Sequence, residues 1–441
     1  MEKLQLLKVS EDGRFIVKED GTPFFWLGDT GWELFHRQSR EGAVEYLKNR
    51  AELKFNVIQA VLLSEFDGLR VPNVYNRTPL LQNSKGEYDP ALPDLTTEAG
   101  DYTYWDHVDY IIDQAAELGL YIGLLPTWGD KYNLKWGKGP EIFNNENAYI
   151  YGKWVGERYG SKKNIIWVLG GDRQLNYPRH LEVMQGLAKG IKEKETIPHL
   201  MTFHPEGFTS SSSRVHNEDW LDFNMIQSGH DRQNNDNYKR VEDDYARKPV
   251  KPVLDAEPRY EDHPINFNSV NGYFDDYDVR QAAYWAVFAG ACGHTYGHHC
   301  IWGMNTELSD YYIMDWKTAM VRPGARQMEH LRKLMESRPF LRIKPDQELL
   351  AGNYEGANHM QAAKGDDYAY IYSPCGLNFR INMGRISGEK VKAYWYNPRN
   401  GEAHYINEYL NTGTATFVPP TSGRNNDWVL ILDDWKCTRN I

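Results

Sequence analysis

Eight short apolar segments recur between residues 23 and 301, and segments with apolar residues at helical spacing separate them. Trp105, Val108, Ile111 and Ile112 show that helical spacing clearly. The apolar segments are nearly continuous runs, as expected when helices cover a parallel sheet. Because no glycine-rich phosphate loop follows the first of them, the alternation favours an α/β fold of the (β/α)8 TIM-barrel type over a doubly wound sheet. The predicted strands are residues 23–29, 55–63, 120–128, 164–169, 199–204, 223–228, 249–255 and 293–301.

The two ends of the chain follow other patterns. Residues 14–17, the turn at 19–21 and the segment from Pro23 onward predict a β-hairpin that opens the chain, within residues 1–23 and running into the first strand. After Pro345 the pattern changes to short strands and turns, which indicates an all-β domain, most simply a sandwich. We therefore predict a barrel domain over residues 1–345 and a C-terminal β-sandwich domain over residues 346–441.

A long segment, residues 64–103, is rich in Asn, Tyr, Pro and Gly. It is too long for a simple connection inside a compact domain. We expect it to overhang the active end of the barrel and to shape the substrate site, with a short helical or β element inside it as the alternative.

Composition and charge exclude several classes of partner. Fifty Lys and Arg stand against 61 Asp and Glu, a formal net charge of −11 with no basic block, so nucleic acid is not an expected partner. No apolar run approaches the roughly 18 residues of a membrane span. The aromatic fraction of 13% is high, and flat apolar rings with polar edges suit a sugar-binding cleft, although a large barrel also buries many aromatic residues.

Two carboxylates follow predicted strands on opposite sides of the barrel. Asp172 comes after the fourth strand and two glycines, and Glu257 closes the seventh. Chemistry in this fold takes place at the C-terminal ends of the strands, and a glycosidase needs two carboxyl groups that flank one bond. Burial would raise the pKa of Asp172 and suit it to be the acid, while Glu257 stays ionised as the nucleophile. Asp255 is an alternative nucleophile, and capping of the next helix is an alternative role for Asp172.

The eighth predicted strand carries two Cys and three His within residues 292–300. Side chains on alternating faces of a strand cannot all converge on one ion, and no C-x2-C or H-E-x-x-H spacing is present. We favour a polar barrel wall that contacts sugar hydroxyls, with a metal site as the alternative. For any one wall residue a buried structural role is the alternative. The predicted substrate-binding residues are Asp29, Trp32, Gln59, Trp128, His204, Gln227, His230, Tyr296, His298 and Trp302.

Taken together, these residues resemble a known family. The opening LKVS at 7–10, FFWLGDTGW at 24–32, GGD at 170–172, DAEP at 255–258 and GHTYG at 293–297 are similar to the motifs of the apiosidase-like glycoside hydrolases, family 140. The trailing domain resembles the collagen-binding-type domain that follows these enzymes, although we do not carry the collagen function over. The resemblance covers nearly the whole chain. It implies that Asp172 matches the family's acid/base and Glu257 its nucleophile.

We therefore expect a retaining glycoside hydrolase that works by double displacement. The resemblance implies an oligosaccharide or polysaccharide substrate from plant cell walls, in particular the apiose to rhamnose linkage in side chains of the pectin rhamnogalacturonan II. It implies no cofactor, and a periplasmic or secreted enzyme if an export signal has been removed, otherwise a cytoplasmic one. Two alternatives remain open: a non-catalytic carbohydrate-binding barrel, and a metal-dependent hydrolase that uses the histidines of the eighth strand.

Overall fold

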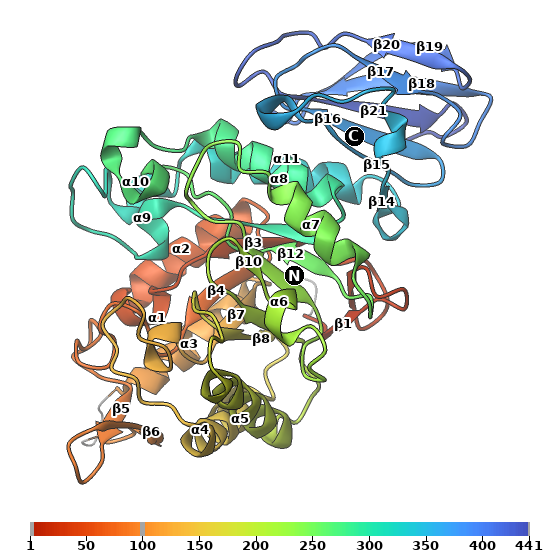
Figure 1. Cartoon of the computed structure of the whole chain (residues 1–441). Coiled ribbons are helices and arrows are strands. Elements are labelled where there is room, and N and C mark those ends of the chain that lie inside the picture. Colours follow the sequence, from red (N-terminus) through yellow and green to blue (C-terminus); the bar gives the residue numbers. More distant parts are fainter. Residues whose placement is uncertain (1–3, 98–101, 440–441) are drawn as a thin grey trace.

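The computed structural model describes residues 4–97 and 102–439 and confirms the predicted barrel (Figure 1). Eight strands follow the order β11-β12-β13-β3-β4-β7-β8-β9, and the ladders between neighbours are parallel. The Thr202 hydroxyl joins the two ends by donating to the Phe223 carbonyl oxygen at 2.6 Å. The barrel strands are β3 (Trp26–Thr30), β4 (Val57–Val61), β7 (Tyr121–Leu125), β8 (Ile165–Gly170), β9 (Met201–His204), β11 (Asn224–Gln227), β12 (Val253–Asp255) and β13 (Gly293–Tyr296). A short extra strand, β10 (Thr209–Ser210), pairs antiparallel with β11.

Helices cover the outside of the barrel, and every residue of the eight barrel strands is buried. This explains why the strands are nearly continuous apolar runs in the sequence. Capping boxes at Thr103, Asn144 and Asp275 fix where three of the helices begin. The helices are α1 (Leu34–Arg37), α2 (Arg40–Glu52), α3 (Tyr104–Glu117), α4 (Asn145–Tyr159), α5 (Pro178–Lys194), α6 (Ser212–Val215), α7 (Asn237–Ala246), α8 (Asp276–Phe288), α9 (His299–Trp302), α10 (Trp316–Ala319) and α11 (Pro323–Glu336).

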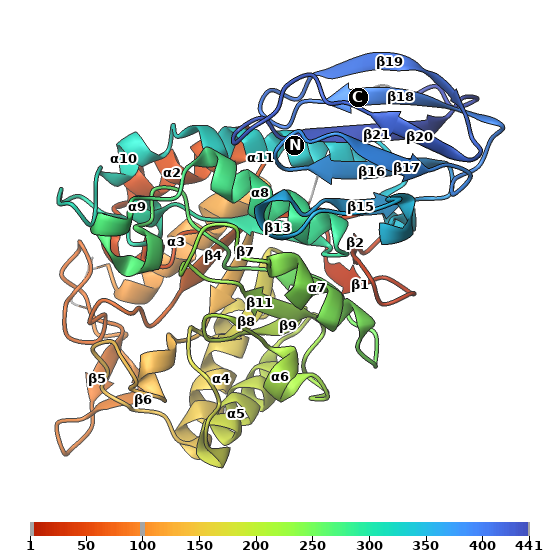
Figure 2. The same ribbon diagram turned by 45° about the horizontal axis from the view of Figure 1, so that its top comes forward.

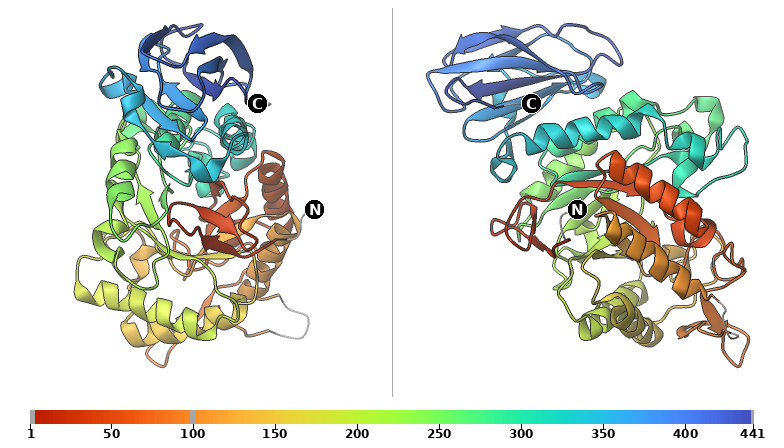
Figure 3. Two further views of the ribbon diagram at one scale, coloured as in Figure 1. Left: turned by 90° about the vertical axis from the view of Figure 1, so that its right-hand side faces the viewer. Right: turned by 180° about the vertical axis from the view of Figure 1, so that it is seen from behind.

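The predicted turn at residues 19–21 is present, and a strand that was not predicted precedes it. β2 (Ile16–Lys18) pairs with the segment that leads into β3 through a bridge between Val17 and Pro23, with the Lys18 N–H donating to the Thr22 carbonyl oxygen at 2.9 Å and the Phe24 N–H to that of Ile16 at 3.1 Å. The additional strand β1 (Leu7–Val9) pairs antiparallel with the other edge of β2. The hairpin lies across the N-terminal end of the barrel (Figure 3). Its apolar side chains close that end of the core, and this burial selects the observed pairing. The residues that join the barrel core are Leu7, Phe15 and Ile16.

The eighth strand is shorter than the predicted range 293–301. β13 ends at Tyr296, and the imidazole of His298 accepts a hydrogen bond from the Cys300 N–H at 3.0 Å as the N-cap of α9. The alternation of faces expected for a strand therefore applies to His294 and Tyr296, whereas His298 begins a helix.

The long segment 64–103 contains a β-hairpin. β5 (Leu80–Gln82) pairs antiparallel with β6 (Tyr88–Pro93), and this hairpin lies to the side of the barrel, beyond α3 (Figure 1). Its residues 98–101 lie outside the described residues. Among the described residues of the segment, those that contribute to the main cavity described below are Glu65 and Phe66, at its start.

The C-terminal part of the chain is an all-β sandwich, as predicted, and lies over α8 and α11 (Figure 2). A six-stranded antiparallel sheet in the order β14-β15-β16-β21-β18-β19 packs against the pair β17-β20 through a core of its own. The strands are β14 (Lys344–Pro345), β15 (Gln361–Lys364), β16 (Tyr368–Ser373), β17 (Phe379–Asn382), β18 (Lys390–Tyr396), β19 (Ala403–Leu410), β20 (Thr414–Phe417) and β21 (Trp428–Asp434).

The other face of the large sheet packs on the barrel, because side chains alternate along each strand. Ala369 and Ile371 of β16 lie in the sandwich core, whereas Tyr370 and Tyr372 join the hydrophobic core of the barrel. Tyr372 stacks on Tyr284 of α8 with ring centroids 5.0 Å apart. No helix among the described residues is both long enough and apolar enough to cross a membrane.

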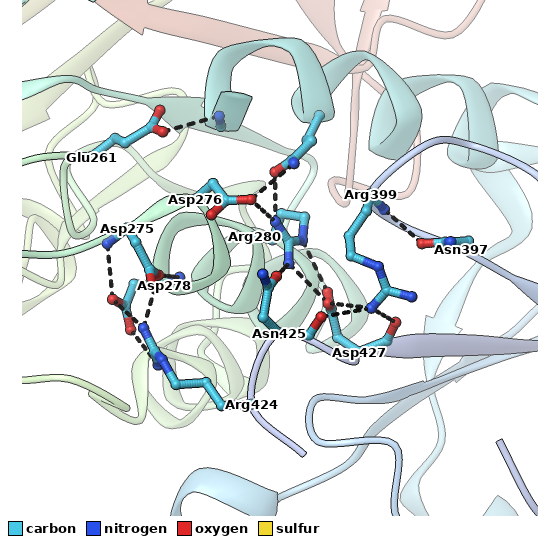
Figure 4. Close-up of polar contacts among 12 residues, drawn as sticks. Glu261, Asp275, Asp276, Asp278, Arg280, Asn397, Arg399, Arg424, Asn425 and Asp427 are labelled. Carbon is cyan, nitrogen blue, oxygen red and sulfur yellow. Dashed lines mark hydrogen bonds and ion pairs between the residues drawn. The ribbon is translucent and has the colours of Figure 1, made fainter. Parts of the chain in front are cut away.

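Ion pairs, one of them fully buried, add polar contacts across the same interface (Figure 4). Arg280 of α8 donates to both carboxylate oxygens of Asp427, at 3.1 and 2.9 Å, and neither side chain is exposed. Arg424 donates to Asp275 at 2.8 Å and to Asp278 at 3.0 Å, at the start of α8. The barrel and the sandwich therefore share one continuous interface of stacked rings and paired charges.

Candidate active site

A sharp turn of three residues after β8 places Asp172 in the main cavity. Gly170, Gly171 and Asp172 all have positive φ, at 92°, 113° and 54°. A Cβ atom at Gly170 would lie 2.5 Å from the His204 carbonyl oxygen, so the close approach requires glycine. The next helix, α5, begins at Pro178 with Tyr177 as its N-cap, so Asp172 does not cap it.

Asp172 is held by donors from two neighbouring segments. Its Oδ2 accepts hydrogen bonds from Trp136 Nε1 at 3.1 Å and from the Arg173 guanidinium at 3.0 Å. Burial and the charge of Glu257 nevertheless raise the pKa of the Asp172 carboxyl to about 6, against the opposing effect of Arg173. Near neutral pH this group can therefore both donate and accept a proton.

Glu257 lies two residues beyond the end of β12 and faces two histidines. Its Oε2 lies 3.0 Å from His204 Nε2, and its Oε1 lies 3.1 Å from His230 Nε2. Burial by itself would raise the pKa of Glu257, but hydrogen bonding to His204 and His230 outweighs it and holds the pKa at about 2. Glu257 is therefore a carboxylate over the whole physiological pH range.

His204 connects the two carboxyl groups. The backbone N–H of Asp172 donates to His204 Nδ1 at 3.3 Å, so Nδ1 carries a lone pair. The proton of the neutral ring then resides on Nε2, the atom that faces Glu257. The ring thus supplies a donor to Glu257 and an acceptor to the turn that holds Asp172.

A cavity of about 610 Å³ opens over these groups. Most of its wall is aromatic, and none of the described residues that line it is Lys or Arg. The predicted site residues that line it are Asp172, Glu257, Trp32, Trp128, Gln227, His230 and Trp302. Residues from the ends of six different barrel strands thus come together as sequence analysis expects of this fold.

The other predicted residues lie outside the cavity wall. His204 is buried behind Glu257. Asp29 is fully buried and accepts hydrogen bonds from Tyr46 at 2.6 Å and from Arg50 at 2.5 Å. Gln59 donates to the Ala256 carbonyl oxygen at 3.1 Å, beneath the turn to Glu257.

Tyr296 and His298, which belong to the eighth predicted strand, and Asp255, the alternative nucleophile, also lie outside the cavity wall. The Tyr296 hydroxyl donates to Glu261 at 2.6 Å, and His298 Nε2 lies 3.0 Å from Asp262. Asp255 accepts hydrogen bonds from Ser228 and Asn237, both at 2.8 Å, inside the barrel. These placements give all three residues partners within the protein rather than a position on the cavity wall.

The sequence patterns do not predict the residues that loops bring to the cavity. These residues lie outside the strands and helices, whose periodic patterns can be recognised in the sequence. The one sequence feature that marks most of them is an aromatic or acidic side chain in a polar loop. Glu65 is notable because burial and the charges of Asp172 and Glu33 raise its pKa to about 8. The missed lining residues are Glu65, Phe66, Trp136, Glu206, Gly207, Phe208, Gly229, Tyr260, His263, Phe267, Tyr311 and Tyr312.

The histidines after residue 292 point in different directions. His294 is fully buried, and burial lowers its pKa to about 3. His299 packs against His263 and stacks on Tyr312, with ring centroids 4.4 and 4.8 Å apart. Within residues 4–97 and 102–439, no three Cys, His, Asp or Glu side chains gather in a way that could hold a metal ion.

Comparisons with known proteins agree with this architecture. Residues 10–342 match the family model described as "Apiosidase-like, catalytic domain", and residues 344–433 match "Putative collagen-binding domain of a collagenase". A solved structure titled "Glycoside hydrolase" is 38% identical over 98% of both chains, with a TM-score of 0.88. A glycoside hydrolase family 5 structure from Bacteroides vulgatus ATCC 8482 is 36% identical over 98% of this chain and 93% of that one, with a TM-score of 0.89. No curated protein matches the sequence. With a catalytic-domain match over most of its length and two solved glycoside hydrolases above one-third identity, the chain belongs to the apiosidase-like glycoside hydrolases.

Proposed function

We propose that this enzyme is a retaining glycoside hydrolase in which Asp172 is the acid/base and Glu257 the nucleophile. The observation that carries the proposal is the opposite shift of two carboxyl groups in one cavity. The pKa of Asp172 is raised to about 6 by burial and by Glu257, whereas hydrogen bonding to His204 and His230 overcomes burial and lowers the pKa of Glu257 to about 2. A pair of carboxyl groups whose environments separate their pKa values is the pattern of an acid and a nucleophile.

The reaction proceeds in two displacements. Glu257 attacks the anomeric carbon while Asp172 gives its proton to the glycosidic oxygen, so the bond to the leaving sugar breaks and a glycosyl ester forms. Asp172, now a carboxylate, takes a proton from water, and the water oxygen attacks the same anomeric carbon. The ester bond then breaks, Glu257 is released as a carboxylate, and the sugar leaves with its original anomeric configuration.

Unpaired polar atoms around the carboxyl groups support a sugar as the ligand. Trp128 Nε1, Gln227 Oε1, His230 Nδ1 and Glu206 Oε2 are buried and make no hydrogen bond with any residue that the structure describes. Buried polar groups normally form hydrogen bonds, so unpaired polar atoms in a cavity wall indicate a ligand that carries both donors and acceptors. Sugar hydroxyl groups supply both, and the rings of Trp32 and Trp302 offer apolar faces to the sugar's C–H groups.

We further propose a pectic substrate of the rhamnogalacturonan II type, with apiose as the first sugar to test. The support is the match of residues 10–342 to a family described as apiosidase-like. Because such a polymer lies outside the cell that degrades it, a periplasmic or secreted location goes with this substrate.

The test uses a panel of pectic side-chain oligosaccharides with wild type, Glu257→Gln and Asp172→Ala. We expect Glu257→Gln to lose at least about 10³-fold in kcat and Asp172→Ala about 10²- to 10⁴-fold. On a glycosyl fluoride, whose leaving group departs without a proton, azide should restore turnover to Asp172→Ala by forming the glycosyl azide of retained configuration, because this small nucleophile attacks the glycosyl ester without a general base. Proton NMR of the first product formed by wild type should show retention. Inversion, or wild-type rates in Glu257→Gln, would overturn the assignment.

A further inference from the structure

Trp136 lies on a loop that the barrel fixes beside Asp172. The loop follows β7 and wraps around Asp130, whose Oδ2 accepts hydrogen bonds from the N–H groups of Lys138 at 3.2 Å and Gly139 at 2.8 Å. Asp130 itself pairs with Lys131 at 2.7 Å, and both side chains are fully buried. Gly137, next to Trp136, has a φ of 101° and approaches Asp130 closely. A buried charge pair therefore sets the course of an otherwise exposed loop.

The indole of Trp136 makes a specific contact with the carboxyl group of Asp172. Its Nε1 donates to Asp172 Oδ2 at 3.1 Å, and the guanidinium of Arg173 lies 4.1 Å from the centre of its ring. Arg173 also donates to Asp172 Oδ2 and to the Trp136 carbonyl oxygen. The three side chains thus hold one another, with Oδ2 of the carboxyl group accepting from two donors.

This arrangement decides which oxygen of Asp172 carries a proton. An oxygen that accepts hydrogen bonds from an indole N–H and a guanidinium is the poorer site for the proton, because protonation would weaken both bonds. The two donors to Oδ2 therefore favour Oδ1 as the oxygen that holds the proton and delivers it to the glycosidic oxygen. A side-chain hydrogen bond from Gln227 and the charges of Glu257 and His204 also act on this carboxyl group.

The same tryptophan is open toward the cavity. Its side chain lines the cavity and is 41% exposed, far more than the buried rings of Trp32 and Trp128. The exposed ring face borders the cavity beside the acid/base carboxyl group, so a ligand in the cavity can reach it. Exposed aromatic rings beside a glycosidase acid are suited to stacking on a sugar.

A second exposed ring reaches the cavity from the other neighbour of β8. Phe208, on the loop after β9, also lines the cavity and is 43% exposed. Its φ is 64°, a left-handed conformation that is rare and strained for a bulky residue. Gly229 makes room for its ring, since a Cβ atom there would lie 2.8 Å from it. An ion pair of 2.5 Å between Lys135 and Glu206 joins the two loops next to these rings.

We propose that Trp136 is a positioning residue for Asp172 and that Trp136 and Phe208 form the binding site for the leaving sugar. The indole N–H fixes the acid/base carboxyl group, and the two exposed rings hold the sugar whose oxygen receives the proton. The inference rests on the proposed role of Asp172 as acid/base and adds a link between leaving-group binding and proton transfer.

The first arm of the test needs no substrate. The indole N–H resonance of Trp136, assigned by its loss in Trp136→Phe, should shift with pH in the free enzyme as Asp172 titrates. The shift should vanish in Asp172→Asn, which keeps the size of the side chain and has no proton to lose. An indole resonance that does not respond to pH, or that still titrates in Asp172→Asn, would overturn the positioning role.

The second arm tests the contribution of the indole N–H of Trp136 apart from that of its aromatic ring. Trp136→Phe keeps a ring and loses the donor that favours the Asp172 carboxylate, so the pKa of Asp172 should rise. The acid form is the one required, so the basic limb of the kcat/KM profile should move up by about half to one pH unit. Trp435→Phe, a change at a partly exposed tryptophan of the sandwich domain, is the matched control and should leave the profile in place.

The third arm compares leaving groups. Trp136→Ala and Phe208→Ala should each lower kcat/KM about 5- to 10-fold on the pectic oligosaccharide that wild type cleaves fastest. The comparison substrate is the fluoride of the sugar that Glu257 attacks, in which a single fluoride replaces the leaving sugar. On this substrate Phe208→Ala should match wild type within about twofold. Equal losses on both substrates would overturn the leaving-sugar site.

These outcomes distinguish the inference from the proposed function. If Asp172→Ala retains activity on the oligosaccharide, the acid/base assignment fails, whatever Trp136 does. If Asp172→Ala is inactive on the oligosaccharide and rescued by azide on the glycosyl fluoride while Trp136→Phe keeps the wild-type pH profile, the inference alone fails.

Discussion

At the scale of single residues, the environment rather than the residue type divides the two roles in the cavity. Aspartate is the stronger acid in water, yet here burial and the charge of Glu257 raise the pKa of Asp172 to about 6. Glu257 is even less exposed than Asp172, but two histidines offer it hydrogen bonds and its pKa is lowered. The difference lies in partners contributed by β9 and by the loop after β11.

His204 should therefore control the acid limb of the pH profile. His204→Asn removes the ring that faces Glu257, so the pKa of Glu257 should rise toward its ordinary value. Glu257 must be ionised to attack, and the acid limb of kcat/KM should move up by about one pH unit. The measurement is kcat/KM between pH 3 and 9. His180→Asn, at a buried histidine of α5 outside the cavity, is the control, and an equal shift there would contradict the argument.

Which residues line the site could be predicted only where a strand positions them. Trp128, Gln227 and His230 directly follow apolar runs, and all three reach the cavity. Asp29 follows such a run too, but Arg50 of α2 lies beneath it and pairs with it. No sequence pattern near Asp29 predicts that partner, since the contact of Asp29 with Arg50 depends on how α2 packs on the barrel.

At the scale of elements, the positions of the strands could be predicted from the sequence, whereas the ends of the strands and the paths of the loops could not. β13 stops at Tyr296 although the predicted strand runs to Ile301, because His298 caps a helix through a contact with Cys300. Trp136 and Phe208 reach the cavity on loops whose paths depend on a buried Asp130 and on a left-handed backbone. Such contacts are long-range and leave no periodic signal in the sequence.

The turn after β8 gives the element-scale prediction. Gly171 has a φ of 113°, and an added Cβ atom would lie 3.0 Å from the Gly129 nitrogen and from the Trp128 ring. Gly171→Ala should therefore shift Asp172 and lower kcat about 10- to 100-fold, with a loss of about 1–3 kcal/mol in the free energy of unfolding.

Gly413 is a matched control for this change. It lies between β19 and β20 with a φ of 71°, and no atom of the described residues lies within 4 Å of an added Cβ atom. Gly413→Ala should cost about 1 kcal/mol of stability through its backbone conformation alone and leave kcat unchanged. Equal kcat in the two variants would show that the turn does not set the position of Asp172.

At the scale of the whole molecule, the sandwich domain completes the hydrophobic surface of the barrel. Tyr370 and Tyr372 of β16 stack on Phe288 and Tyr284 of α8, with ring centroids 5.5 and 5.0 Å apart. These tyrosines belong to the same buried cluster as the barrel core. Since α8 leads into β13, the sandwich stabilises a helix that packs behind the cavity.

A shared core and a buried ion pair predict that the two domains unfold together. Asp427→Ala leaves Arg280 charged and buried without its main partner, which should lower the free energy of unfolding by about 3–5 kcal/mol. Scanning calorimetry should show one transition in wild type and one in the variant, both at the temperature where activity is lost. Glu45→Gln, at an ion pair whose side chains are 58% and 47% exposed, should change stability by less than about 0.5 kcal/mol. Two separate transitions, with only the lower one shifted by Asp427→Ala and activity following the upper one, would show that the barrel does not depend on the sandwich. A single shifted transition would instead make the sandwich a structural part of the catalytic barrel.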